Sequence, residues 1–137
     1  MDLRILLALA IAALILWLGS GVFSSYPAPS ATPEITSVEF PKEIQADGQE
    51  ALGTVSFQDP NGDILEARFE VKQAVLFEPF HFDPEVQGQK QGKFDFSVFT
   101  VIPQEITLRV TLVDQAGHES QPVEFSFTAV ESMGNSP

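Results

Sequence analysis

The feature that most constrains the fold is an alternation of apolar and polar residues that recurs after residue 34. Between residues 65 and 72, apolar Leu65, Ala67, Phe69 and Val71 alternate with Glu66, Arg68, Glu70 and Lys72. This period of two indicates a β-strand with one buried face, because successive side chains point to opposite sides of a strand. The same pattern occupies residues 51–58, 94–98, 106–112 and 123–129, and a further strand is expected at 35–40, before Pro41.

Strands with one polar face cannot form a parallel sheet that is covered on both sides, so they are expected to pack as two antiparallel layers. No amphipathic helix of useful length follows residue 23. The sequence therefore predicts an all-β fold: a single antiparallel sandwich of about seven strands at residues 34–131, preceded by one N-terminal hydrophobic helix.

That helix is expected at residues 1–23, where an unbroken apolar run covers residues 5–18 and follows Arg4. If the helix extends from residue 5 to residue 23, it is ~28 Å long at 1.5 Å per residue and matches the hydrocarbon thickness of a bilayer. An uncleaved membrane anchor and a cleaved signal peptide both fit this segment. Both place the following domain outside the cytoplasm, because the positive charge of Arg4 lies before the helix. The first predicts a single-pass protein of the cell membrane, and the second a secreted or periplasmic protein.

Two short segments flank the predicted domain. Residues 24–33 (SSYPAPSATP) are rich in Pro and Ser and have no periodicity, so they are interpreted as an extended linker. Residues 132–137 are interpreted as a flexible tail.

Charge and composition exclude several classes of function. The formal net charge is −12, which excludes nucleic acid as a partner and disfavours anionic lipid, because both require a basic face. The chain has no cysteine, which excludes thiol catalysis, thiolate metal sites and attachment of lipid to an N-terminal cysteine.

Two turns share one chemistry. In Asp59-Pro60-Asn61-Gly62, an aspartate and a proline precede a glycine that tolerates positive φ, which predicts a type I turn with a following bulge that joins two strands as a hairpin. The segment Asp114-Gln115-Ala116-Gly117 also begins with aspartate and ends with glycine, so it predicts a second turn of the same kind later in the chain.

The segment 106–120 (ITLRVTLVDQAGHES) resembles the sixth strand and following hairpin of fibronectin type III and related bacterial immunoglobulin-like domains. Asp114, Ala116, Gly117 and Ser120 match the pattern D-x-A-G-N-x-S, and His118 stands where asparagine is usual. The segment 57–64 (FQDPNGDI) resembles the D-P-D-G-D turn of bacterial cadherin-like and PKD-like domains. The resemblance implies an immunoglobulin-like sandwich, and it specifies a fold rather than a function.

The acidic turns are a candidate metal site. In an immunoglobulin-like sandwich the two turns emerge at the same end, so Asp59, Asn61 and Asp63 are expected near Asp114, with Glu119 within reach. Converging oxygen ligands are what Ca²⁺ requires. The alternative is that the same residues serve the turns through local hydrogen bonds. No other cofactor is expected.

Residues 76–84 (LFEPFHFDP) form a second candidate site, for a protein partner. Phe77, Phe80 and Phe82 lie close together between two prolines, which disfavour regular strand pairing. One interpretation is an aromatic loop that inserts into a partner. The other is that the rings cover the open side of the sandwich and are buried.

No catalytic residues are predicted. The two histidines, His81 and His118, lack the cysteine of a copper site and have no serine that the sequence places beside them. The sequence therefore favours a non-enzymatic, membrane-tethered interaction module that acts outside the cytoplasm. The alternative is a Ca²⁺-dependent adhesion or carbohydrate-binding module that uses the acidic turns.

Overall fold

The computed structural model of the chain describes residues 32–132. These residues form eight strands: β1 (Glu34–Glu39), β2 (Glu43–Gln45), β3 (Ala51–Gln58), β4 (Ile64–Gln73), β5 (Phe80–Phe82), β6 (Gln91–Val98), β7 (Gln104–Asp114) and β8 (Val123–Val130). The predicted helix at residues 1–23 and most of the predicted linker and tail lie outside the described residues. Within 32–132 no helix is long and apolar enough to cross a membrane.

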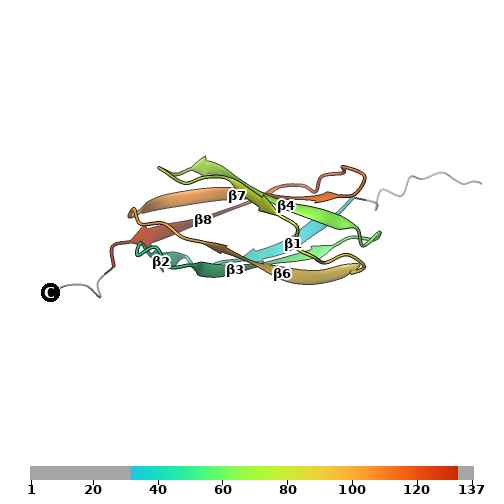
Figure 1. The fold of residues 1–137 in the computed structure, drawn as a ribbon, viewed down its shortest axis with the longest axis horizontal. Coiled ribbons are helices and arrows are strands. Elements are labelled where there is room, and N and C mark those ends of the chain that lie inside the picture. Colours follow the sequence, from blue (N-terminus) through green and yellow to red (C-terminus); the bar gives the residue numbers. More distant parts are fainter. Residues whose placement is uncertain (1–31, 133–137) are drawn as a thin grey trace, which may run out of the picture. The chain divides into compact units, whose positions relative to one another are not determined.

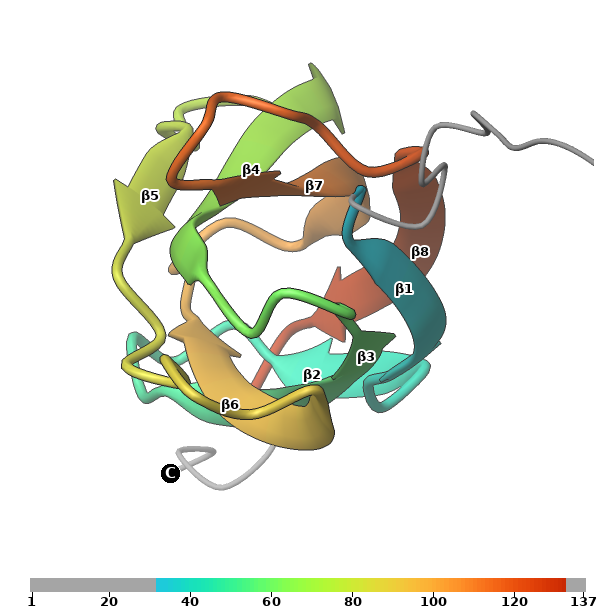
Figure 2. The same ribbon diagram turned by 90° about the vertical axis from the view of Figure 1, so that its right-hand side faces the viewer.

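The strands form two layers, which Figure 1 shows from the side and Figure 2 from the end at which β1 begins. One sheet has the order β1-β3-β6 and the other has the order β2-β8-β7-β4-β5. All neighbours are antiparallel except β2 and β8, which pair in parallel. The prediction of an all-β sandwich is confirmed, with eight strands in place of about seven and with one parallel pair.

The expectation of a hairpin at Asp59-Pro60-Asn61-Gly62 is wrong. This turn joins β3 to β4, and the two strands belong to different sheets. The turn itself forms as expected, with Gly62 at a φ of 60° and its N–H donating to the carbonyl of Asp59 at 2.9 Å. The chain therefore crosses from one layer to the other here. The alternation of residues fixes which face is buried but not which sheet a strand joins.

The core between the layers is rich in phenylalanine, as the alternating apolar positions predict. Phe69 of β4 is fully buried. Its ring lies 4.8 Å from the ring of Phe96 on β6, in the opposite sheet, measured between ring centroids. Burial of such large rings is the main source of stability in a domain of this size.

Gly53 of β3 makes room for these rings. A Cβ atom at this position would lie within 2.6 Å of Cδ1 of Phe40 and would overlap the ring of Phe96. No side chain can occupy this position without moving both rings. The glycine therefore permits the close approach of the aromatic residues to the backbone of β3.

The described residues of the sandwich belong to one compact unit. Its buried hydrophobic cluster is drawn from residues 44–129. The sandwich therefore contains its own core and is expected to fold without the preceding segment.

Candidate functional sites

The two acidic turns meet at the end of the sandwich where β1 begins. Glu34 at the start of β1 pairs with Gln58 at the end of β3, so the β3–β4 turn lies at this end. The loop between β7 and β8 joins it there, because the N–H of Gln115 donates to the carbonyl of Asp63 at 3.0 Å. This arrangement, here called the acidic rim, agrees with the expected proximity of the two turns.

Asp59 is fully buried within its own turn. Its Oδ2 accepts a hydrogen bond of 2.8 Å from the N–H of Asp63, as an aspartate at the start of a turn commonly does. Its Oδ1 is buried and has no hydrogen-bond partner, and neither has Oδ1 of Asp63. Buried polar atoms are nearly always paired, so two orphaned carboxylate oxygens in one turn need an explanation.

The pKa of Asp63 lies above its ordinary value. Burial is the main cause, and two further factors add to it: the hydrogen bond that a protonated Asp63 would donate to the side chain of Asp59, and the charges of Asp59 and Asp114. Each of these factors favours the neutral form of the Asp63 carboxyl group. A proton on Asp63, or a cation beside it, would therefore supply the partner that the buried oxygens lack.

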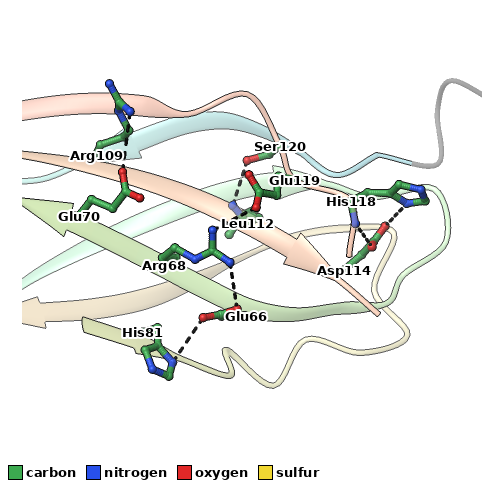
Figure 3. A network of polar contacts seen from close by, with 10 residues as sticks. All are labelled: Glu66, Arg68, Glu70, His81, Arg109, Leu112, Asp114, His118, Glu119 and Ser120. Carbon is green, nitrogen blue, oxygen red and sulfur yellow. Dashed lines mark hydrogen bonds and ion pairs between the residues drawn. The ribbon is translucent and has the colours of Figure 1, made fainter. Parts of the chain in front are cut away.

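Asp114 has the opposite environment. Its Oδ1 accepts hydrogen bonds from the N–H groups of Ala116 at 3.0 Å and His118 at 2.8 Å, and its Oδ2 lies 3.0 Å from Nδ1 of His118. Figure 3 shows Asp114 and His118 facing each other in this loop. Burial raises the pKa of Asp114, but the hydrogen bonds and the His118 side chain outweigh it, and the pKa lies below its ordinary value.

The four predicted calcium ligands thus differ in whether their side-chain oxygens are free to bind a cation. Asp59 and Asp63 have orphaned oxygens, Asn61 is exposed in the turn, and both oxygens of Asp114 are engaged within its own loop. In the described part of the chain, no group of three or more acidic or histidine side chains is arranged to hold a metal ion. The calcium hypothesis therefore stays a prediction, and it rests on the Asp59–Asp63 pair.

Glu119 faces away from this pair, toward the outer surface of the five-stranded sheet. Its Oε2 lies 3.1 Å from Nη1 of Arg68, while Nη2 of the same arginine lies 3.5 Å from Oε1 of Glu66. Glu66 also lies 3.4 Å from Nδ1 of His81, so the four side chains form one network (Figure 3). These are solvated surface ion pairs, which contribute little to stability.

Neither histidine faces a free nucleophile among the residues that the structure describes. His81 contacts Glu66, and His118 contacts Asp114. The nearby hydroxyl of Ser120 is engaged, because it accepts from the N–H of Leu112 at 2.9 Å and donates to the carbonyl of Gln121 at 3.1 Å. The geometry of a serine triad is not formed here.

The predicted aromatic loop is part of the sandwich. Phe80 and Phe82 belong to β5, which pairs with β4, and Phe77, Phe80 and Phe82 are all half-buried against the core. The rings of Phe80 and Phe82 lie 4.6 Å and 6.1 Å from that of Phe69. This placement follows the second interpretation, in which the rings cover the open side of the sandwich. Their role in binding a partner stays a prediction.

A groove of about 330 Å³ lies beside this segment, between the edges of the two sheets. Its walls come from the β4–β5 connection and the end of β6: Leu76, Phe77, Glu78, Pro79, Phe80, Ser97, Val98 and Phe99. The groove lies at the end of the sandwich opposite the acidic rim, since β4 and β6 both run away from the rim.

Large exposed apolar residues gather at this same end. Of the six in the described range, only Leu65 lies near the acidic rim. The other five, here called the apolar tip, are Leu52, Val75, Leu76, Phe99 and Val101. Contacts hold their connections together: the side chain of Gln104 accepts from the N–H of Val75 at 2.7 Å, and the N–H of Gly48 donates to the carbonyl of Thr100 at 3.1 Å.

Leu76 is the most exposed of these residues, with 86% of its surface accessible, and its φ is 53°. This left-handed conformation is rare for a branched hydrophobic residue and costs of order 1 kcal/mol. An exposed leucine in a strained conformation contributes nothing to the core. Strain at exposed positions is commonly associated with function, which makes Leu76 a candidate contact residue.

Sequence reasoning missed the apolar tip, although a signal was present. Leu52 precedes the inward-facing Gly53 and Val55, and Phe99 follows the inward-facing Val98, so both occupy positions where the alternation calls for polar residues. Large apolar residues at outward positions of two paired strands are a sign of a contact surface.

No protein-family model and no curated protein match the sequence. Among solved structures, the chain is similar to an adhesin from Streptococcus sanguinis, with a TM-score of 0.51 and 13% identity over 77% of this chain and 61% of that one. It is also similar to fibronectin(III)-like modules from Clostridium thermocellum, with a TM-score of 0.50 and 13% identity over 80% of this chain and 51% of that one. A PKD domain of an M14-like peptidase from a Thermoplasmatales archaeon gives a TM-score of 0.49 at 18% identity, over 72% of this chain and 93% of that one.

The chain thus spans less than two thirds of the adhesin and of the fibronectin(III)-like structure. At these identities the likeness concerns the fold alone. Together with the two-sheet topology, the likeness to the adhesin and to the fibronectin(III)-like modules shows that residues 34–130 have the fold of an immunoglobulin-like, fibronectin type III-like β-sandwich.

Proposed function

We propose that this chain is a non-enzymatic interaction module that acts outside the cytoplasm, tethered by its apolar N-terminal segment. The observation that carries the proposal is the apolar tip: five large exposed hydrophobic residues gather at one end, beside a groove. Contiguous exposed apolar surface on a soluble domain marks an interaction site. An adhesin is among the proteins with this fold, which accords with a binding role on a cell surface.

The test is position-resolved photo-crosslinking of the full chain in the cells that produce it. A photo-crosslinking amino acid at Phe99, in the apolar tip, is compared with one at Gln121, an exposed residue on the β7–β8 loop. We expect one reproducible adduct from position 99, identified by mass spectrometry, and none from position 121. Equal crosslinking from both positions, or none from either, contradicts the proposal. Protease accessibility of the sandwich in intact cells tests its location.

A second candidate function is Ca²⁺-dependent adhesion or carbohydrate binding at the acidic rim. The observation that favours it is the pair of buried oxygens, Oδ1 of Asp59 and Oδ1 of Asp63, which have no hydrogen-bond donor. A hard cation would satisfy both, with backbone carbonyls and water completing its shell of six to eight oxygens.

Thermal unfolding of residues 31–137 in EDTA and in millimolar Ca²⁺ tests this second candidate. A site filled to ~10 times its dissociation constant adds about 1.4 kcal/mol, which raises Tm by roughly 5–10 °C for a domain of this size. The rise should disappear in Asp59→Asn, while Asp47→Asn, at the opposite end of the sandwich, serves as the matched control. Identical midpoints in EDTA and Ca²⁺ would exclude the metal site and favour a proton shared by the two carboxyl groups.

A further inference from the structure

We infer that the groove beside the apolar tip binds an extended segment of a partner protein, added as a strand to the free edge of β6, with bulky apolar side chains and lysine or arginine beside them. This inference rests on the proposed function and specifies its surface and the chemistry of its partner. Three independent features of the described residues support it: an unprotected strand edge, an apolar groove and a one-sided charge distribution.

The first feature is the difference between the two strand edges on this side of the sandwich. β5 and β6 are the terminal strands of their sheets and lie on the same side in Figure 2. β5 has only three residues and is bracketed by Pro79 and Pro84, which protect an edge from pairing. β6 has eight residues, and its last part, Ser97–Val98 with the following Phe99, has neither proline nor charge. Unpaired backbone groups at such an edge accept an added strand.

The second feature is the groove along that same part of β6. Ser97, Val98 and Phe99 line one wall, and Leu76, Phe77 and Phe80 line the other. A strand added to β6 would place alternate side chains into the groove, because successive side chains of a strand point to opposite faces. The apolar walls select a bulky apolar side chain at those positions. Leu76, which is exposed and lines the same groove, would contact that side chain.

The third feature is the charge around the tip. The three connections that meet here, residues 46–50, 74–79 and 99–103, contain Asp47, Glu50 and Glu78, and they contain no lysine or arginine. Glu78 lines the groove itself. A partner with lysine or arginine at the ends of the added segment, beside its apolar side chains, would meet complementary charge, which gives specificity and speeds association. A second copy of this chain, with its net charge of −12, would bring like charges together.

The experiment uses residues 31–137 labelled with ¹⁵N and three synthetic eight-residue peptides. The first alternates threonine with valine, has one phenylalanine in a valine position, and carries lysine at both ends. The second has glutamate in place of lysine, and the third carries backbone N-methyl groups on alternate residues. We expect the first peptide to shift the amide signals of residues 95–99 and 76–80 and to bind more weakly as salt increases. We expect the other two peptides to bind at least ~10-fold more weakly.

Variants of the sandwich make the assignment specific. Leu76→Asn suits a positive φ and Phe99→Ser removes an exposed ring, so both should fold, and each should raise the Kd of the first peptide about 10-fold. Glu78→Lys should weaken binding of the lysine peptide and strengthen binding of the glutamate peptide. Leu65→Thr, a comparable exposed apolar residue near the acidic rim, should leave both affinities unchanged.

Several results would overturn the inference. Equal binding of the N-methylated peptide would rule out strand addition, and equal binding of the glutamate peptide would rule out the charge assignment. Absence of binding by all three at millimolar concentration would rule out both. Dimerisation in sedimentation, lost in Phe99→Ser, would assign the edge to a second copy of this chain. Crosslinking from position 99 in cells distinguishes these failures from a failure of the proposed function, because it detects a partner at the tip whatever its chemistry.

Discussion

The ring of Phe80 lies flat against the ring of Phe69, with 4.6 Å between the centroids and 10° between the planes. Phe69 is fully buried on β4, the strand next to β5 in the five-stranded sheet, so its partner belongs to the wall of the core. The short strand β5 therefore contributes to stability in addition to lining the groove.

Phe80→Ala is accordingly expected to lower the free energy of unfolding by about 2–3 kcal/mol, because it removes a half-buried ring and leaves a cavity against Phe69. Phe99→Ala, which removes a ring that is 58% exposed, should change the free energy by less than about 0.5 kcal/mol. Urea unfolding of residues 31–137 measures both values. Similar losses for the two variants would show that Phe80 does not support the core.

Gly53→Ala is expected to destabilise the sandwich by about 1–3 kcal/mol, because the added Cβ collides with the rings of Phe40 and Phe96. In an ordinary strand the same substitution stabilises slightly, since glycine weakens a strand interior. Thermal unfolding distinguishes the two cases by the sign of the change in Tm. Ser56→Ala, on the same strand with its side chain on the outer face, is the control and should have little effect.

Asp63→Asn is expected to stabilise the domain by about 1 kcal/mol at pH 7 in the absence of Ca²⁺. The raised pKa of Asp63 means that its ionised form is disfavoured in the folded state, and an amide can donate to the carboxylate of Asp59 instead. The stability associated with neutral Asp63 is full below its unfolded pKa of about 3.9 and is lost as pH rises through the higher folded pKa.

The advantage of the Asn variant should therefore shrink as pH falls from 7 toward 4, where wild-type Asp63 takes up its proton. Urea unfolding at a series of pH values provides the measurement. A variant that is less stable than wild type at pH 7 would mean that the Asp63 carboxylate has a partner in solution, and a cation would be the first one to test.

Asp114→Ala should have the opposite sign, with a loss of about 2–3 kcal/mol at pH 7. It removes a buried carboxylate that accepts two backbone hydrogen bonds and contacts His118. Because the folded pKa of Asp114 is lowered, its ionic contribution is present above the unfolded pKa and is lost as pH falls through the folded value, below about pH 4. The difference from wild type should therefore be smaller at pH 3 than at pH 7, as measured by urea unfolding.

The long strands were predictable because their register is visible in the residues themselves. In β4 and β7 the alternation runs over many residues, and the buried positions match it from Ala67 and from Ile106 onward, apart from Thr111, which is also buried. The expectation that Leu65 faces the core is wrong, because a register shift between Ile64 and Glu66 buries Ile64 and leaves Leu65 exposed. β2 has only three residues and exists because β8 offers a parallel partner, which is information that no local pattern contains. In β5, Phe80-His81-Phe82 alternates and pairs with β4, although the neighbouring prolines in the sequence predicted that it would not pair. At the edge of a sheet, prolines outside the three paired residues cost no hydrogen bond.

The candidate sites were predictable only in part, for a similar reason. Turn chemistry identified Asp59 and Asp114, and the resemblance to a known fold brought their turns to one end. The sequence could not distinguish their environments, because Asp114 receives its donors within its own loop while Asp59 keeps an orphaned oxygen. The apolar tip depends on three connections that are distant in sequence, and it becomes visible only when the strands are assembled.

The described chain enters the sandwich and leaves it at opposite ends, since β1 begins at the acidic rim and β8 ends beside the apolar tip (Figure 1). Strands of up to 11 residues separate these ends by about 35 Å at ~3.3 Å per residue. A pulling force between a tether before Glu34 and a partner at Leu76 would act along the strands. It would load the hydrogen bonds between β1 and β3 in shear, all at once, rather than peel them apart one by one. The architecture is therefore suited to bear mechanical load between two anchored bodies.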